Sequence, residues 1–176
     1  MIGSKKPELV ILTPFFTPNI GGAETFTNDL IELFRGDNQK VTVLTYKPLT
    51  TRARAPLIEK HANLTIYRLP WLSGKYFYKF EKNAFLQFIY LGAGLFVMLL
   101  VYCISTFGKP KRVMALGLSA LSVGALTKFL FVKIQLDCIL LTIYRFRSRP
   151  FLSSILSFLS KKVHTYYCLS DEAAHD

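Results

Sequence analysis

Two adjacent glycines and a glutamate are the residues in this sequence whose types and spacing most suggest chemistry. Gly21 and Gly22 follow the apolar run 9–12, and Glu24 stands two residues later, where an amphipathic pattern begins. Backbone N–H groups at a helix start are unpaired and carry the positive end of the helix dipole, so they attract anions. Glycine has no Cβ to keep a phosphate or a sugar from the backbone. The spacing predicts a phosphate or sugar site, although a plain turn between strand and helix explains the glycines equally well.

Three arginines form a second group that could bind a ligand. Arg145, Arg147 and Arg149 alternate directly after the apolar run 138–144. Alternate side chains of an extended chain point the same way, and the arginine fork suits phosphate. These side chains could meet the phosphate of an acceptor or lipid headgroups; a solvated basic loop is the alternative.

Apolar patterns of two periods define the elements that would position these groups. Continuous or alternating apolar runs predict strands, and a spacing near 3.6 residues predicts helices. The expected strands are 9–12, 40–46, 63–69, 138–144 and 163–169, and the expected helices begin near residues 23, 84, 118 and 150. Residues 48–59 are polar and are expected to form a surface loop. This alternation predicts an α/β fold, a three-layer, Rossmann-like domain with a mainly parallel sheet.

Residues 84–107 carry no charged side chain. About 20 such residues can cross a bilayer, and a helix on a globular surface should show a polar stripe that is missing here. The segment could span the membrane, dip into one leaflet, or form a fully buried helix. A single span would place the strands before and after it on opposite sides of the membrane. Spanning therefore requires the predicted sheet to be wrong, and we expect attachment from one side or burial.

The net charge of +11 is concentrated around the same segment. Between residues 75 and 162, Glu81 and Asp137 are the only acids against thirteen Lys and Arg. Basic residues beside long apolar runs indicate an anionic membrane surface or a diphosphate as the partner. No nucleic-acid-binding motif accompanies the charge, so no nucleic acid is expected as a partner.

The three cysteines bear on the compartment. Cys103, Cys138 and Cys168 lie in apolar or strand-like surroundings without C-x-x-C spacing. This pattern predicts buried thiols in a reducing compartment, with no disulfide framework and no metal site. The apolar stretch near the N-terminus is too short for a signal peptide. We therefore expect a protein on the cytoplasmic side of the membrane, peripheral or monotopic.

The glycine segment also resembles a known family. The order Pro18-x-x-Gly21-Gly22-x-Glu24 after a strand, with the strand KVTVLTY at 40–46 after the helix, resembles the N-terminal domain of the family-4 glycosyltransferases. These are retaining sugar-nucleotide enzymes of GT-B architecture. The resemblance implies that the chain is one half of a GT-B fold.

Two later segments extend the resemblance and depart from it. Residues 109–117, KPKRVMALG, are similar to the family's fourth strand and the loop beyond it, but an aspartate and two histidines frequent there are replaced. Tyr144 stands where many members place a histidine near the reacting sugar. A tyrosine, with a reference pKa near 10, is a poor base at neutral pH. The resemblance therefore leaves the catalytic residue unknown.

The resemblance implies a function for the whole chain, taken as a domain over residues 1–176 that is truncated before a donor-binding domain. It implies transfer of a sugar from a nucleotide-sugar donor to a membrane-linked acceptor, such as a polyprenyl- or lipid-linked glycan. No His/Asp cluster or D-x-D motif appears in the sequence, so no metal ion or other cofactor is expected. The residues implied in binding the donor phosphate or the acceptor are Gly21, Gly22, Glu24, Tyr144 and Arg145. Activity would require the donor-binding half, in the same protein or as a separate chain.

Two alternatives remain open. The chain could be a non-catalytic membrane-anchoring subunit of a split glycosyltransferase. It could also be a small membrane protein in which 84–107 and 113–126 form a helical hairpin, although the strands expected at 40–46 and 63–69 argue against this.

Overall fold

The computed structural model describes residues 7–71, 74–81, 83–107, 110, 112–140, 157–159 and 161–168. It contains a seven-stranded sheet in the order β3-β4-β2-β1-β5-β6-β7. The strands are β1 (Leu9–Leu12), β2 (Val41–Tyr46), β3 (Ile58–Lys60), β4 (Leu64–Leu69), β5 (Arg112–Leu116), β6 (Gln135–Leu140) and β7 (Thr165–Cys168). The helices are α1 (Gly22–Gly36), α2 (Gly74–Glu81), α3 (Ala84–Ser105) and α4 (Leu118–Leu130).

Neighbouring strands run parallel throughout the sheet except for β3, which is antiparallel to β4. The predicted α/β fold with a mainly parallel sheet is therefore confirmed. β3 begins at Ile58, so the surface loop expected over residues 48–59 is wrong for its last two residues. The three residues of this edge strand are exposed or half-buried. They show no apolar period that would reveal a strand.

Strand β6 also differs from its prediction. It begins at Gln135 rather than at 138, and the polar Gln135 and Asp137 interrupt the apolar pattern that marks a buried strand. Residues 141–144 of the predicted strand lie outside the described residues.

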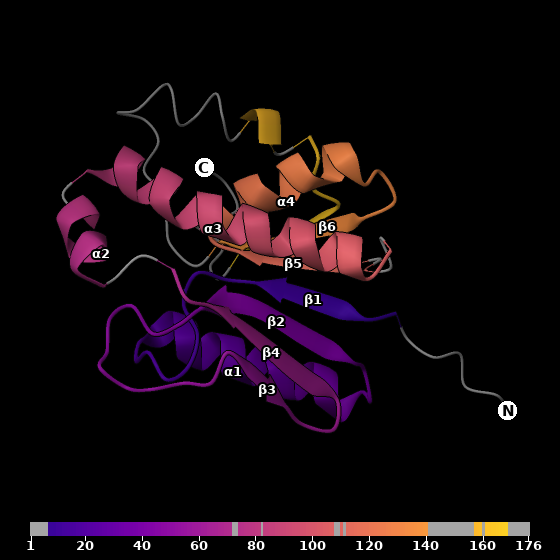
Figure 1. Cartoon of the computed structure of the whole chain (residues 1–176). Helices are drawn as coiled ribbons and strands as arrows, with labels where there is room; N and C mark the ends of the chain where they lie inside the picture. Colours follow the sequence, from indigo (N-terminus) through magenta and orange to yellow (C-terminus); the bar gives the residue numbers. More distant parts are fainter. Residues whose placement is uncertain are drawn as a thin grey trace, which may run out of the picture.

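The central strand β1 separates two hydrophobic clusters. Its four residues are fully buried. Val10 and Leu12 belong to a cluster shared with α3 and α4, whereas Leu9 and Ile11 belong to a cluster shared with α1. Helix α1 thus covers one face of the sheet, and α3 and α4 cover the other (Figure 1). Because helices cover both faces, the strands can be apolar on both sides, which is why β1 and β2 are uninterrupted runs.

Helix α1 packs as its periodicity predicts. Ile31 is buried against the sheet, and Phe26, Leu30 and Phe34 pack around the same cluster. The helix begins at Gly22, directly after the glycine pair's first member, and no side chain caps its start.

One side of helix α3 is bound to the sheet. The residues on this side with no exposed surface are Leu95, Leu99 and Cys103. The Tyr46 hydroxyl donates a hydrogen bond to the Leu91 carbonyl, and Trp71 Nε1 donates one to the Tyr90 carbonyl at 2.9 Å. Near the other end of α3, the Tyr102 hydroxyl reaches the Glu8 carboxylate beside β1 at 3.0 Å. Polar contacts therefore tie both halves of this apolar helix to the sheet.

The other side of α3 is exposed, so the expectation of a fully buried helix is wrong. Among the described residues, the segment Phe85–Ser105 is the one helix long and apolar enough to cross a membrane, and 33% of an apolar 18-residue stretch within it is buried. Strands β4 and β5, before and after it, belong to the same sheet. Residues 112–116 form β5 between α3 and α4, so the alternative helical hairpin is not formed.

Candidate functional site

The loop that carries Gly21 leaves the carboxyl end of β1 and is held by a buried asparagine. Asn19 donates from Nδ2 to the Phe16 carbonyl at 2.9 Å. Its Oδ1 accepts from the backbone N–H and the hydroxyl of Thr50, at 3.2 and 2.8 Å. Thr50 lies in the connection after β2, so this side chain joins the glycine loop to its neighbour at the same edge of the sheet.

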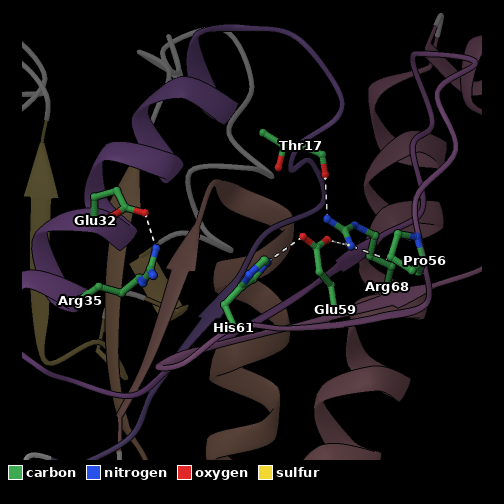
Figure 2. Close-up of polar contacts among 7 residues, drawn as sticks. All are labelled: Thr17, Glu32, Arg35, Pro56, Glu59, His61 and Arg68. Atoms are coloured by element: carbon green, nitrogen blue, oxygen red, sulfur yellow. Dashed lines mark hydrogen bonds and ion pairs between the residues drawn. The ribbon is translucent and has the colours of Figure 1, made fainter.

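A buried arginine holds the same loop from a third element. Arg68 of β4 donates to the Thr17 carbonyl at 3.1 Å and to Glu59 Oε2 of β3 at 2.7 Å. A third, longer contact reaches the Pro56 carbonyl at 3.4 Å. Figure 2 shows the guanidinium between the loop and the edge hairpin of β3 and β4. We call these contacts the Arg68 clasp.

Gly21, Gly22 and Glu24 lie at the start of α1. Both glycines are exposed, while Glu24 is 8% exposed. A Cβ added to Gly21 would lie 2.6 Å from Glu24 Oε2, so a side chain here would have to displace the carboxylate. A Cβ added to Gly22 would have no atom within 4 Å. The space over Gly22 is therefore open to a ligand, and it lies next to the first-turn N–H groups of α1.

The charge at this helix start is mixed. The helix dipole favours an anion there, but the Glu24 carboxylate in the first turn already offsets part of that positive potential. A carboxylate accepts hydrogen bonds from hydroxyl groups, whereas backbone N–H groups donate them to phosphate or hydroxyl oxygens. The arrangement can therefore serve a ligand that presents hydroxyls together with an anionic group, which describes a phosphorylated sugar.

A second glycine turn lies beside the first. β1 pairs with β5, and the chain leaves them in opposite senses, through α1 on one face and α4 on the other (Figure 1). Open parallel sheets bind ligands at such a switch point, outside the carboxyl ends of the strands. Gly117, which follows β5, has φ 82°, a left-handed conformation that favours glycine. Gly117 keeps its place in the 109–117 motif, but the sequence did not show that the strand before it pairs with β1.

The remaining predicted site residues are not described. Tyr144 and Arg145 lie in residues 141–156, outside the described residues, as do Arg147 and Arg149. β6 ends at Leu140, at the carboxyl edge that also carries the two glycine turns. The part of Tyr144 and Arg145 in the site stays a prediction.

Two further kinds of reactive side chain, metal ligands and thiols, bear on the site. No group of three or more His, Cys, Asp or Glu side chains there could hold a metal ion. Cys103 is fully buried on α3, and burial raises the pKa of its thiol to about 11. This thiol is therefore protonated near neutral pH and does not act as a nucleophile.

Comparisons with known proteins place the fold. No protein-family model and no curated protein sequence matches the chain. Among solved structures, sucrose-phosphate synthase of Thermosynechococcus elongatus matches with a TM-score of 0.63 and 11% identity over 95% of this chain. A trehalose-phosphate synthase (UDP-forming) of Burkholderia vietnamiensis matches with a TM-score of 0.61 and 12% identity over 97%. The catalytic domain of starch synthase IV of Arabidopsis thaliana, bound to ADP and acarbose, gives 0.58 and 12% over 78%.

These neighbours are GT-B glycosyltransferases, and the chain has the fold of a Rossmann-like half of that architecture. It spans 78% of the sucrose-phosphate synthase chain, 41% of the trehalose-phosphate synthase chain and 34% of the starch synthase chain. At these identities the likeness concerns the fold.

Proposed function

We propose that the chain is the acceptor-side half of a GT-B glycosyltransferase, of family-4 type, that moves a sugar from a nucleotide donor to a membrane-linked acceptor. The observation that carries this proposal is the pair of glycine turns at the switch point between β1 and β5. The solved neighbours support the sugar chemistry, since one is described as UDP-forming and another was solved with ADP and acarbose.

Each residue at the loop has a role in this proposal. The open backbone at Gly22 would allow a diphosphate or a sugar hydroxyl to approach the first-turn N–H groups of α1. The carboxylate of Glu24 would accept hydrogen bonds from sugar hydroxyls, and the Arg68 clasp would keep the loop in place. Tyr144 and Arg145 would join the site from the end of β6. The donor-binding half would come from a second domain or a separate chain, and no metal ion is required.

A second candidate is a non-catalytic subunit that anchors a separate donor-binding chain at the membrane. The exposed apolar side of α3 is the observation behind this alternative. Radiolabelled nucleotide sugars, incubated with the chain and a membrane lipid extract, separate the two. Transfer of label by the chain alone rules out the non-catalytic subunit. If transfer requires an added donor-binding chain, Gly22→Ala separates the two candidates: loss of transfer supports the acceptor-side half, and unchanged transfer supports the anchoring subunit.

The role of the glycine loop is tested by a substitution that the fold tolerates. Gly22→Ala introduces a methyl group into open space at the first residue of α1, so the chain should remain as stable as the wild type. Gly36→Ala is the matched control, because it adds the same methyl group to open space at the other end of the same helix.

Binding of nucleotide sugars is measured by saturation-transfer NMR for wild type and both variants. We expect at least a tenfold loss of affinity, about 1.4 kcal/mol, for Gly22→Ala and none for Gly36→Ala. Equal affinities for the two variants would show that the loop does not contact the ligand, and no binding by the wild type would count against the proposed function.

A further inference from the structure

The outer side of α3 carries an apolar stripe whose large side chains are about half exposed or more. Its large exposed residues recur every three or four positions around Ala93, with one longer step across it. They are Phe85 (53% exposed), Ile89 (48%), Val97 (48%), Val101 (58%) and Ile104 (61%). At 1.5 Å per residue the stripe is about 30 Å long. A contiguous apolar surface of this size marks an interaction site.

Contacts on the buried side of α3 fix the orientation of the helix, so the stripe faces away from the sheet. Tyr46 and Trp71 donate hydrogen bonds to carbonyls of α3, and Tyr102 reaches Glu8. Leu95 and Leu99 are fully buried between the helix and the sheet. Rotating α3, or withdrawing it to cross a bilayer, would break these contacts. The partner must therefore approach the stripe from outside, parallel to the helix axis.

A basic and aromatic cluster lies at the end of the neighbouring helix α4. Phe129 (51% exposed) stacks on Phe158 (56%) with ring centroids 6.2 Å apart. Lys162 Nζ lies 4.6 Å from the centre of the Phe129 ring. Leu126, Leu130 and Val132 are exposed in the same region, together with Lys133 and Lys161. Aromatic rings and lysines of this kind are typical of the boundary between acyl chains and headgroups.

The charge of this helical layer is of one sign. Helices α3 and α4 contain no acidic residue, and Lys128 is their one charged residue. A second copy of the chain would bring like charges together. A bilayer that contains anionic lipids provides opposite charge and an apolar interior in the same partner.

We propose that the stripe of α3 lies in the plane of an anionic lipid bilayer, with the cluster around Phe129 and the lysines beside it at the headgroups. This inference rests on the proposed function, because the bilayer would be the surface that holds the membrane-linked acceptor. Vesicle binding requires no catalysis, so a failure here leaves the sugar-transfer proposal standing, and failed transfer leaves vesicle binding unaffected.

The test is co-sedimentation with phosphatidylcholine vesicles, with and without phosphatidylglycerol. The variant Ile89→Ser/Val97→Ser/Val101→Ser removes the middle of the stripe. Leu33→Ser/Leu57→Ser/Ile58→Ser is the matched control, because these residues lie in or beside α1 and β3, away from the α3 layer, and are 68%, 47% and 54% exposed. Circular dichroism confirms that each variant is folded.

We expect wild type and control to bind the anionic vesicles alike, more weakly at high salt, and the α3 variant to lose at least tenfold in partition coefficient. Absence of wild-type binding would overturn the proposal, and so would equal binding by the α3 variant. A wild-type dimer in light scattering that the α3 substitutions dissociate would also overturn it, since a second copy would then cover the stripe.

Discussion

Replacing Arg68 tests whether the Arg68 clasp positions the glycine loop. The Arg68 side chain is 3% exposed and donates to Thr17, Glu59 and Pro56. Methionine is similar in length but has no charge and no donor. Arg68→Met therefore leaves two loop carbonyls without this donor and Glu59 without its cation.

The size of the effect follows from burial. A hydrogen bond to a charged group contributes about 1.5–3 kcal/mol, and breaking a fully buried ion pair costs about 3–5 kcal/mol. The Glu59 side chain is 33% exposed and keeps its contact with His61 at 2.9 Å. The Pro56 contact is long, and the buried Arg68 Nε has no partner, so the substitution removes a cost there. We expect a loss of about 2 kcal/mol in the free energy of unfolding.

The assay combines urea unfolding with hydrogen exchange of loop residues 13–21. Arg68→Met should speed exchange in this loop more than in the central strands. Arg68→Lys keeps a positive charge near Glu59 but lacks the forked donors of the guanidinium. It should therefore restore part of the free energy of unfolding and less of the protection of the loop against hydrogen exchange. Arg35→Met is the control, because the Arg35–Glu32 pair is exposed and should contribute less than about 1 kcal/mol (Figure 2). A loss of stability no larger than that of Arg35→Met, or unchanged exchange in the loop, would show that the Arg68 clasp does not hold the loop.

Three further predictions concern packing, acid stability and reactivity. In a urea titration, Gly94→Ala should lower the free energy of unfolding by about 1–3 kcal/mol, since the new Cβ would lie 2.5 Å from Tyr46 Oη. Gly92→Ala is the control and should not destabilise the chain, because its new Cβ would lie 3.9 Å from the nearest neighbouring atom. Hydrogen bonds from His61 and Arg68 lower the pKa of Glu59, so the contribution of Glu59 to the free energy of unfolding is complete above its ordinary pKa of 4.5 and is lost as pH falls through the lower pKa of the folded chain. Glu59→Gln should therefore flatten the decline of stability in acid. An unchanged slope of stability against pH would contradict this. Because the Cys103 thiol is buried and its pKa is raised, iodoacetamide should label Cys103 at pH 8 only after the chain unfolds. Mass spectrometry measures the labelling, and rapid labelling of Cys103 in the folded chain would contradict its burial.

The elements around the glycine loop could be predicted from the sequence because their patterns are local. Continuous apolar runs indicate strands buried on both faces, as in Leu9–Leu12 and Val41–Tyr46. The helical period of α1 indicates which side of that helix is buried. The glycine pair and Glu24 are also neighbours along the chain, so the sequence already placed them together.

Other features depend on contacts that no local pattern reports. Arg68 occupies a polar position in an alternating strand, where a solvent-facing side chain is the usual expectation, and only the fold shows its contacts with Thr17 and Glu59. Helix α3 is apolar all round, so its period could not show which side meets the sheet. Tyr46 and Trp71, far from it in sequence, determine that orientation through their hydrogen bonds.

The two glycine turns beside β1 and β5 are proposed to form the ligand-binding edge of the sheet. The most direct measurement is an amide NMR titration of the folded chain with nucleotide sugars. We expect saturable shifts at Gly21, Gly22 and Gly117, with little change at the opposite edge near Lys40 and Arg112. Shifts confined to that opposite edge, or none at the glycine turns at saturating ligand, would contradict it.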